Sequence, residues 1–245
     1  MGNGSATDPL GVLAKAPLFR GLSEDELRAA LQVAHHCRVR RHAFFFHQEE
    51  EATTCYVLLK GRVRLSQLTP EGHQVIIRFM GPGDGMGIIV VLSNIAYPLS
   101  AEAVTDCHAL AWDADTMIKL MERMPRLAVS GMQLIAGRFQ ELQKQYRELA
   151  TERVERRVAR ALIRLTRQVG KRVDEGVLLD LPLSRQDLAE MTGTTLYTVS
   201  RILSKWEHNG LIGTGRERVL IHTPHALITI AEDLPTPPKK SGSTQ

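Results

Sequence analysis

Apolar residues near the start of the chain, between residues 9 and 36, follow the spacing of short helices. Within this stretch they recur every three or four positions, at Leu27, Ala30, Leu31 and Ala34. Ser23 precedes Glu26 by three positions, which is the spacing of a capping box at a helix start. The pattern therefore predicts short helices over residues 9–36, one of them beginning at Ser23.

The pattern changes between residues 37 and 112, where apolar runs become short and alternate with turn sequences. Residues 56–59 and 75–79 are strand-sized apolar runs. Residues 69–72 and 81–85 contain glycine and proline and are typical of turns between strands. Short strands with turns at regular intervals indicate an all-β sandwich or barrel in this part of the chain.

Helical spacing returns over residues 114–150 and includes a regular heptad pattern. Apolar side chains alternate at intervals of four and three residues, at Ala128, Met132, Ile135, Phe139, Leu142, Tyr146 and Leu149. Such a seam is typical of a two-stranded coiled coil, so we predict a helix that pairs with a second copy of the chain. The alternative is a helix whose apolar stripe packs against its own domain.

Arginine is abundant in the next predicted helix, over residues 153–169. We expect its arginines to lie mostly on the outside, at Arg153, Arg156, Arg157, Arg160, Arg164 and Arg167. The 245-residue chain has 31 basic and 27 acidic side chains. Residues 1–150 contain 16 of each, whereas residues 151–222 contain 13 basic and 9 acidic side chains. The positive excess therefore lies in one segment, which favours a nucleic-acid partner there.

Composition argues against several classes of protein. Apolar runs such as residues 88–92 are too short to span a membrane. Residues 1–8 lack the features of a signal peptide, so we do not expect secretion. The three cysteines, Cys37, Cys55 and Cys107, are scattered and fit a reducing environment. These features predict a soluble cytoplasmic protein.

Residues 183–206 carry the pattern of two short helices joined by a tight turn. Ser184 precedes Asp187 by three positions and is placed to cap the first helix. Gly193 stands where such a turn needs a positive φ, and Thr195 is placed to cap the second helix. Helix, glycine-containing turn and helix together predict a helix-turn-helix motif.

The second of these helices is expected to bury one face and expose the other to DNA. The candidate DNA contacts are Ser184, Thr195, Leu196, Tyr197, Thr198, Ser200, Arg201 and Lys205. In the major groove, Arg201 would donate to O6 and N7 of guanine. Residues 210–221 indicate two strands around a glycine-rich turn, a wing from which Arg216 and Arg218 would contact phosphates. The alternative is a helical hairpin with solvated arginines.

Residues 194–203, TTLYTVSRIL, resemble the recognition helix of the CRP/FNR transcription regulators. The order of elements is also similar over about residues 10–232, with glycines of the β segment at Gly61, Gly72, Gly83 and Gly87. The resemblance implies an α+β fold. Its parts are an N-terminal antiparallel β-roll (a double-stranded β-helix) with flanking helices, a long dimerisation helix and a C-terminal winged helix-turn-helix. It also implies a homodimer that binds palindromic operator DNA, contacts RNA polymerase and acts as an activator.

The resemblance suggests five segments. These are an N-terminal helical segment (1–36), a β-roll sensor (37–122), a dimerisation helix (123–150), a winged helix-turn-helix domain (151–234) and a disordered tail (235–245). The sensor would bind a small effector. Its candidate pocket residues are Gly87, Ile88, Tyr97, Ser100, Arg138, Leu142 and Gln143.

Departures from the family pattern argue against cyclic AMP as the effector. Family members that bind it carry a Gly-Glu pair for the ribose and a later Arg-Ser pair for the phosphate. Here Ile88 follows Gly87, and the later position has Ser100 with no arginine before it. The polar pair that receives the base corresponds to Leu142 and Gln143. Because burying a phosphate without a paired cation is costly, we expect independence from cyclic AMP in the usual mode.

A further departure lies in the recognition helix. Tyr197 stands where many members have a glutamate that accepts from cytosine, whereas Ser200 and Arg201 match the pattern. Tyrosine cannot replace a carboxylate in that contact. We therefore expect the half-site to keep the guanine that Arg201 reads and to differ beside it.

Several interpretations of the sensor remain open. Some relatives bind haem and respond to carbon monoxide or nitric oxide, and a histidine or Cys37 would then be an axial ligand. The histidines of this half are His35, His36, His42, His47, His73 and His108. The alternatives are a thiol switch among the three cysteines and an apolar effector beside residues 88–92. An iron–sulfur cluster is not expected, because no cysteine precedes Cys37. Residues 35–37 do not suggest a metal cluster, since adjacent side chains point in different directions.

Two other classes of function compete with a transcription regulator. An enzyme built on a cupin-like barrel would need a His-x-His pair around one metal, and the chain has none. We therefore expect no enzymatic activity. A cyclic-nucleotide-binding module without DNA binding is disfavoured by the basic segment and by the predicted helix-turn-helix.

Overall fold

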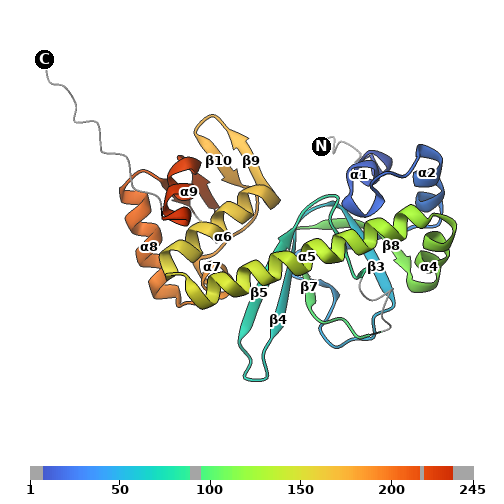
Figure 1. Cartoon of the computed structure of the whole chain (residues 1–245), viewed down its shortest axis with the longest axis horizontal. Coiled ribbons are helices and arrows are strands. Elements are labelled where there is room, and N and C mark those ends of the chain that lie inside the picture. The colour runs from blue at the N-terminus through green and yellow to red at the C-terminus, as the bar shows by residue number, and fades with distance from the viewer. Residues whose placement is uncertain (1–7, 89–94, 216–217, 234–245) are drawn as a thin grey trace, which may run out of the picture. The chain divides into compact units, whose positions relative to one another are not determined.

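The computed structural model describes residues 8–88, 95–215 and 218–233, and the chain divides into two compact units. Unit 1 is Met1–Tyr146 and unit 2 is Arg147–Gln245. The long helix α5 (Pro125–Thr151) contributes residues to both units (Figure 1). Within the described ranges, no helix has the length and apolar character needed to cross a membrane.

Unit 1 contains two four-stranded antiparallel sheets, which form a β-roll. One sheet has the order β1 (His35–Val39), β8 (Cys107–Asp113), β3 (Thr54–Lys60) and β6 (Gly85–Met86). The other has the order β2 (Phe44–Phe46), β7 (Ser100–Ala103), β4 (Val63–Leu68) and β5 (Gln74–Met80). Gly61 joins β3 to β4 at φ 100°, where a Cβ atom would lie 2.6 Å from the Asp106 carbonyl oxygen. Only glycine fits this turn without strain.

The N-terminal helices are α1 (Pro9–Lys15), the 3₁₀ turn η1 (Pro17–Phe19) and α2 (Glu24–Gln32). Ser23 and Glu26 form the predicted capping box, with the Ser23 amide donating to the Glu26 carboxylate at 2.7 Å. The predicted helical stretch is too long at its end. His35 and His36 belong to β1, because they pair with Ala111 and Leu110 of β8.

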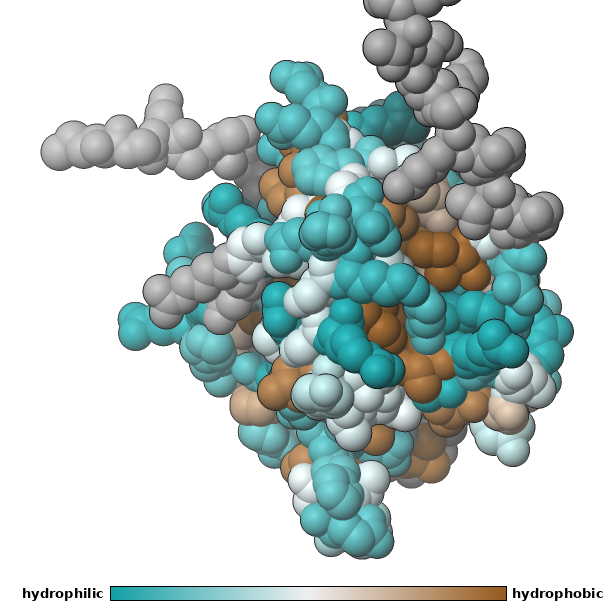
Figure 2. All heavy atoms as spheres, turned by 90° about the vertical axis from the view of Figure 1, so that its left-hand side faces the viewer, coloured by the Kyte–Doolittle hydropathy of each residue, from teal (hydrophilic) through white to brown (hydrophobic). Residues whose placement is uncertain are grey.

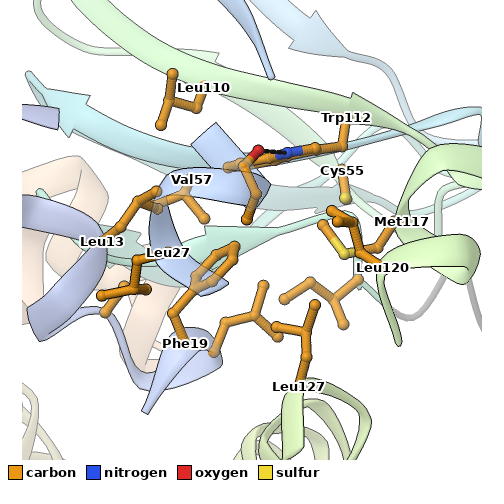
Figure 3. Packing of buried hydrophobic residues seen from close by; sticks show 14 of the residues in the cluster. Leu13, Phe19, Leu27, Cys55, Val57, Leu110, Trp112, Met117, Leu120 and Leu127 are labelled. Carbon is orange, nitrogen blue, oxygen red and sulfur yellow. Dashed lines mark hydrogen bonds between the residues drawn. The ribbon is translucent and has the colours of Figure 1, made fainter. Parts of the chain in front are cut away.

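The core of unit 1 has two parts, of which one lies beneath the N-terminal helices. There, helices α1, α2, α4 (Ala114–Arg123) and α5 cover residues of β3 and β8. Trp112 lies in this cluster with Phe19 against it, and its indole nitrogen donates to the Ala30 carbonyl at 2.9 Å (Figure 3). The second part lies between the two sheets and includes Leu58, Val63 and Ala109. The first part combines helical apolar positions with apolar residues of β3 and β8, and the second is built mainly from strand residues.

The helical stretch predicted over residues 114–150 is two helices, α4 and α5. Met124 has φ −125° and ψ 77°, outside the helical region. Pro125 follows it and begins α5. A proline disfavours helical geometry at the residue before it, which explains the break.

Unit 2 consists of helices around one small antiparallel sheet. Its helices are α6 (Val154–Val169), α7 (Arg185–Thr192), α8 (Leu196–His208) and α9 (Pro224–Glu232). Its sheet has the order β11 (Ile212–Gly215), β12 (Arg218–Ile221), β10 (Gly176–Leu179) and β9 (Gly170–Val173). The β9–β10 hairpin was not predicted from the sequence. The α+β class, the β-roll and the winged helix-turn-helix are confirmed.

Candidate functional site

The turn between α7 and α8 has the two helix caps and the glycine that the sequence predicts. Ser184 caps α7 reciprocally with Asp187, and the two backbone–side-chain bonds are 2.8 and 3.0 Å long. Gly193 ends α7 in the left-handed region, at φ 58° and ψ 48°. Thr195 then caps α8, because its hydroxyl oxygen accepts from the Thr198 amide at 3.2 Å. The turn is therefore held by local bonds on both sides.

The opposite faces of α8 differ in burial. Val199, Ile202, Leu203 and Trp206 are buried, as predicted. Leu196, Tyr197 and Arg201 are exposed, and the Tyr197 side chain stands out at 76% exposure. Thr198 and Ser200 are half-buried, although both are on the list of predicted DNA contacts. The exposed set near the helix start matches the part of a recognition helix that enters a major groove.

The later residues of α8 are partly engaged in contacts within unit 2. Lys205 donates to the Glu155 carboxylate at 3.1 Å, so this predicted DNA contact already has an anionic partner. Glu207 accepts from the amide and the hydroxyl of Thr214 on β11 at 2.9 and 2.8 Å. These bonds hold the wing to α8 and lower the pKa of Glu207. Arg218 is exposed at the start of β12, and Arg216 lies outside the described residues.

Most arginines of α6 are not free on the surface, which corrects the expectation from the sequence. Arg164 donates to Glu148 at 2.6 Å, and Arg156 lies 2.8 Å from Glu152. Arg160 lies 3.8 Å from Glu148 and 3.6 Å from Glu152. The acidic partners come from the last turn of α5 and the residue after it, and the Glu148 side chain is only 5% exposed. Most of the charged arginines of α6 are therefore already paired with carboxylates inside unit 2.

Arg157 makes a different set of contacts, with three backbone carbonyls. Its guanidinium donates to Thr192 at 3.0 Å and to Gly193 at 3.2 Å, in the turn before α8. It also donates to the Glu152 carbonyl at 3.0 Å, just after α5 ends. One side chain thus joins the end of α5 to the helix-turn-helix.

The surface around α8 is mainly hydrophilic. Figure 2 faces the side of the molecule on which Figure 1 draws α8, and hydrophilic residues cover most of the area in view. Smaller hydrophobic patches lie between them. Arg153, the residue before α6, and Arg167 on α6 are exposed. A polar and cationic surface of this kind suits contact with the DNA backbone.

The heptad seam of α5 is largely exposed. Phe139 and Tyr146 are 60% and 75% exposed, and Met132, Leu142 and Leu149 are also exposed. Ile135 differs, because it packs against the core of unit 1. An exposed apolar stripe at this spacing is typical of a helix that has a partner.

A cavity of about 170 Å³ lies in unit 1 between α5 and the β-roll. Of the predicted pocket residues, Gly87, Ile88, Tyr97, Arg138 and Leu142 line it. Ser100 and Gln143 do not belong to its described lining; Ser100 instead accepts a bond from the Gln48 amide. The sequence did not single out the other apolar and polar lining residues, which are Phe46, Leu65, Ile77, Arg78, Gly85, Met86, Pro98, Leu99, Leu134, Ile135, Glu141 and Gln145.

A cluster of ionic side chains stands at one side of this cavity. Glu141 lies 3.2 Å from Arg78 and 3.5 Å from Arg138. Asp84 lies 3.4 Å from Arg138, and its other carboxylate oxygen accepts from the Gly81 amide at 2.9 Å. Burial raises the pKa of Asp84, while the Gly81 amide and Arg78 oppose that rise. The cluster thus joins β5 and the following turn to α5.

Cysteines and histidines lie away from the described lining of the cavity. Burial raises the pKa of Cys55 to about 12, and it also raises the pKa of Cys37 and of Cys107. His36 and His108 form a pair with nitrogen atoms 2.9 Å apart on β1 and β8. Within the described ranges, no three histidine, cysteine or acidic side chains are grouped for a metal ion.

Two protein-family models match separate parts of the chain. The cyclic nucleotide-binding domain matches residues 36–124, which contain the β-roll and α4. The Crp-like helix-turn-helix domain matches residues 156–230, which contain α7, α8 and the wing. The whole of α5 lies between the two matches.

Similar proteins extend over most of the chain. The nitrogen fixation regulation protein FixK of Azorhizobium caulinodans is 30% identical over 216 residues, 86% of this chain and 86% of that protein. The cyclic AMP receptor protein of Thermus thermophilus is 29% identical over 216 residues, 88% of this chain and 97% of that protein. The structure of FixK2 from Bradyrhizobium japonicum has a TM-score of 0.72 and 26% identity, and the match covers 81% of this chain and 97% of that one.

Proposed function

This chain belongs to the CRP/FNR family of transcription regulators, and on that premise we propose that it is a homodimeric, effector-responsive regulator of palindromic operator DNA. The observation that carries the proposal is the arrangement of α8. Its apolar face is buried, its start is fixed by Thr195, and Tyr197 and Arg201 are exposed beside each other. This is the arrangement that direct reading of base edges requires.

Sequence choice is assigned to the exposed start of α8, and backbone affinity to the wing. Arg201 would donate to the O6 and N7 atoms of guanine, and Tyr197 and Ser200 would contact neighbouring positions. Arg218 would contact a phosphate, as Arg216 would from outside the described residues. Ser184 at the start of α7 would contact the backbone of the same half-site only after its hydroxyl turns away from Asp187, to which it donates at 2.8 Å.

The dimer is assigned to the exposed seam of α5. Burying Met132, Phe139 and Tyr146 against the same residues of a second copy would remove exposed apolar area that a monomer leaves in water. A twofold axis along the paired helices would present two copies of α8, and two recognition helices require a palindromic site. The division of the chain into a sensor before α5 and a DNA-binding domain after it is also part of this proposal.

The effector site is assigned to the cavity beside α5. Cyclic AMP in the usual mode is disfavoured, since Ile88 occupies the position of the ribose-binding glutamate and Leu99 precedes Ser100 where an arginine would be. Leu142 lies in the cavity lining and also on the exposed seam. An effector that contacts Leu142 would therefore change the surface through which the two copies pair, which is how binding would reach the DNA-binding units.

Haem and thiol chemistry receive less support than a small organic effector. The described lining of the cavity offers no histidine or cysteine as an axial ligand. The thiols of Cys55 and Cys107 are buried, and their raised pKa values keep them protonated at neutral pH. Family membership further supports contact with RNA polymerase, activation of transcription and a place in the cytoplasm, where the DNA is.

Selection of operator sequences tests the proposed function. The full chain would be incubated with duplexes that carry a randomised 30-base-pair segment, and the bound fraction would be sequenced after several rounds. We expect enrichment of inverted repeats with a guanine in each half-site. Arg201→Ala should lose the preference for that guanine, while retention of an unchanged motif by this variant, or no enrichment for the native chain, would contradict the proposal.

A further inference from the structure

Two cavities of unit 1 share Leu134 and two charged side chains, Arg138 and Glu141. The first is the apolar cavity already described. The second has a volume of about 280 Å³ and a polar lining that includes Arg20, Asp84 and Ser130. A molecule that filled the first cavity would therefore have its end at the boundary with a polar, charged space.

The charges at this boundary do not cancel. Among the described residues, the charged side chains that line the two cavities are three arginines, Arg20, Arg78 and Arg138, and two carboxylates, Asp84 and Glu141. One positive charge is therefore in excess. Such an excess beside an apolar cavity favours a ligand with one negative charge.

The two carboxylates differ in how firmly they are held. Asp84 accepts from the Gly81 amide in the turn after β5, and its side chain is largely buried. Glu141 has a side chain that is 52% exposed, and within the described residues its carboxylate contacts two side chains, Arg78 and Arg138. Glu141 is thus the anion that a ligand would displace most easily, because its carboxylate can return to water at low cost.

We propose that the effector is a small monocarboxylate with an apolar body, and that Glu141 occupies the position of its carboxylate when no effector is bound. The apolar body lies in the cavity between α5 and the β-roll. The carboxylate accepts from Arg78 and Arg138 in place of Glu141. This inference rests on the proposed function and adds the chemical class of the effector.

The size and the lining of the cavity favour this class over a nucleotide. A cavity of about 170 Å³ is close to the ~150 Å³ cavity in which another protein binds benzene, so it accommodates one ring with a short chain. The cavity is surrounded by Phe46, Ile77, Met86 and Tyr97. In the described lining, Gln145 is the uncharged polar side chain that could form hydrogen bonds with a sugar or a base. An aryl or short alkyl group satisfies such walls, whereas the polar atoms of a nucleotide would be left unpaired.

Displacement of Glu141 supplies a route from the cavity to the dimer. The bonds of Glu141 tie α5 to β5, and Leu142 is the next residue on the seam. Release of Glu141 removes one tether between the helix and the β-roll. The effector thereby favours an arrangement of α5 that differs from the one present without it.

The test is isothermal titration calorimetry of the full chain, without DNA, with 3-phenylpropanoate and with 3-phenylpropanamide. These probes share the apolar body and differ in the charged group. We expect the carboxylate to bind on the order of tenfold more tightly, because its bonds to arginine are charge-assisted. Equal affinities, tighter binding of the amide, or no binding of either probe at millimolar concentration would overturn the proposal.

Two variants examine the role of Glu141 and of the arginines. Glu141→Gln should bind the carboxylate about two- to fivefold more tightly and leave the affinity for the amide unchanged. The reason is that an uncharged glutamine competes less strongly than Glu141 for the two arginines. Arg138→Gln should bring the two affinities to about the same value, and its retained amide binding would show that the cavity is folded. Glu122→Gln, an exposed change on α4 outside both cavities, is the control.

The results for the variants can also contradict the proposal. Weaker carboxylate binding by Glu141→Gln would show that Glu141 assists the anion and would overturn its role as a placeholder. The calorimetry contains no DNA, so its failure would remove the effector class and leave operator selection intact. Failure of operator selection would instead remove the proposed function while leaving the calorimetric result standing.

Discussion

The arginines of α6 and those near α8 belong to the same basic segment and yet have different surroundings. On α6, Arg156, Arg160 and Arg164 contact acidic side chains of unit 2. Arg201 on α8 and Arg218 on β12 are exposed and have no ion pair within the described ranges. The first group is paired inside unit 2, and the second is the group to which we assign DNA contacts.

The difference teaches that a local charge excess does not identify a DNA-binding face by itself. An arginine that is already paired inside the protein releases few counterions from DNA, so it adds little to affinity. A partly buried pair instead matters for stability, because loss of one partner leaves the other charge uncompensated. Each group should therefore respond to substitution in a different measurement.

The largest effect is expected for Arg164→Ala, on stability. Its loss leaves the carboxylate of Glu148 buried, with the more distant Arg160 as its remaining ionic partner among the described residues. The free energy of unfolding in urea should fall by about 3 kcal/mol. The exposed Arg167→Ala on the same helix is the matched control and should stay within about 0.5 kcal/mol of the native chain. Equal losses of unfolding free energy in the two variants would show that the Arg164–Glu148 pair contributes no more to stability than an exposed arginine does.

Arg157→Ala should affect both stability and DNA binding. It removes three hydrogen bonds to carbonyls, two of which lie in the turn before α8. We expect a loss of about 1–2 kcal/mol in the free energy of unfolding, together with weaker operator binding below the melting transition. The measurements are urea unfolding and fluorescence anisotropy with a selected operator. Normal operator affinity in a destabilised variant would limit Arg157 to a purely structural role.

Arg218→Ala should have a smaller effect, and that effect should appear mainly in the dependence on salt. Loss of one phosphate contact lowers the slope of log affinity against log salt concentration by about 1, for each Arg218 that touches DNA. Stability should not change, because Arg218 is exposed. An unaltered slope in anisotropy titrations between low and high salt would exclude Arg218 from the interface.

Local signals made the helix-turn-helix predictable from the sequence. Ser184, Gly193 and Thr195 each act within a few residues of themselves, through a cap or a positive φ, so their roles follow from residue type and spacing. The buried positions of α8 were also correct, because a helical period assigns one face. The β-roll strands and the capping box at Ser23 followed for the same reason.

Features that depend on distant residues were not predictable in this way. The acidic partners of the α6 arginines come from α5 and the residue after it, and the sequence does not show that Glu148 would be buried beside Arg164. Arg78 was not singled out, because only the packing of β5 against α5 places it beside Glu141. The β9–β10 hairpin was missed because its strands are short and both residues between them, Asp174 and Glu175, are charged.

The most direct test of the division between structural and DNA-reading arginines uses Arg201→Ala. Its affinity for a selected operator and for a scrambled duplex would be measured by fluorescence anisotropy at one salt concentration, with thermal unfolding recorded in parallel. We predict a loss of roughly 10- to 100-fold on the operator, a small change on the scrambled duplex and an unchanged melting temperature. Equal losses on both duplexes, or no loss on the operator, would contradict the assignment of sequence reading to α8.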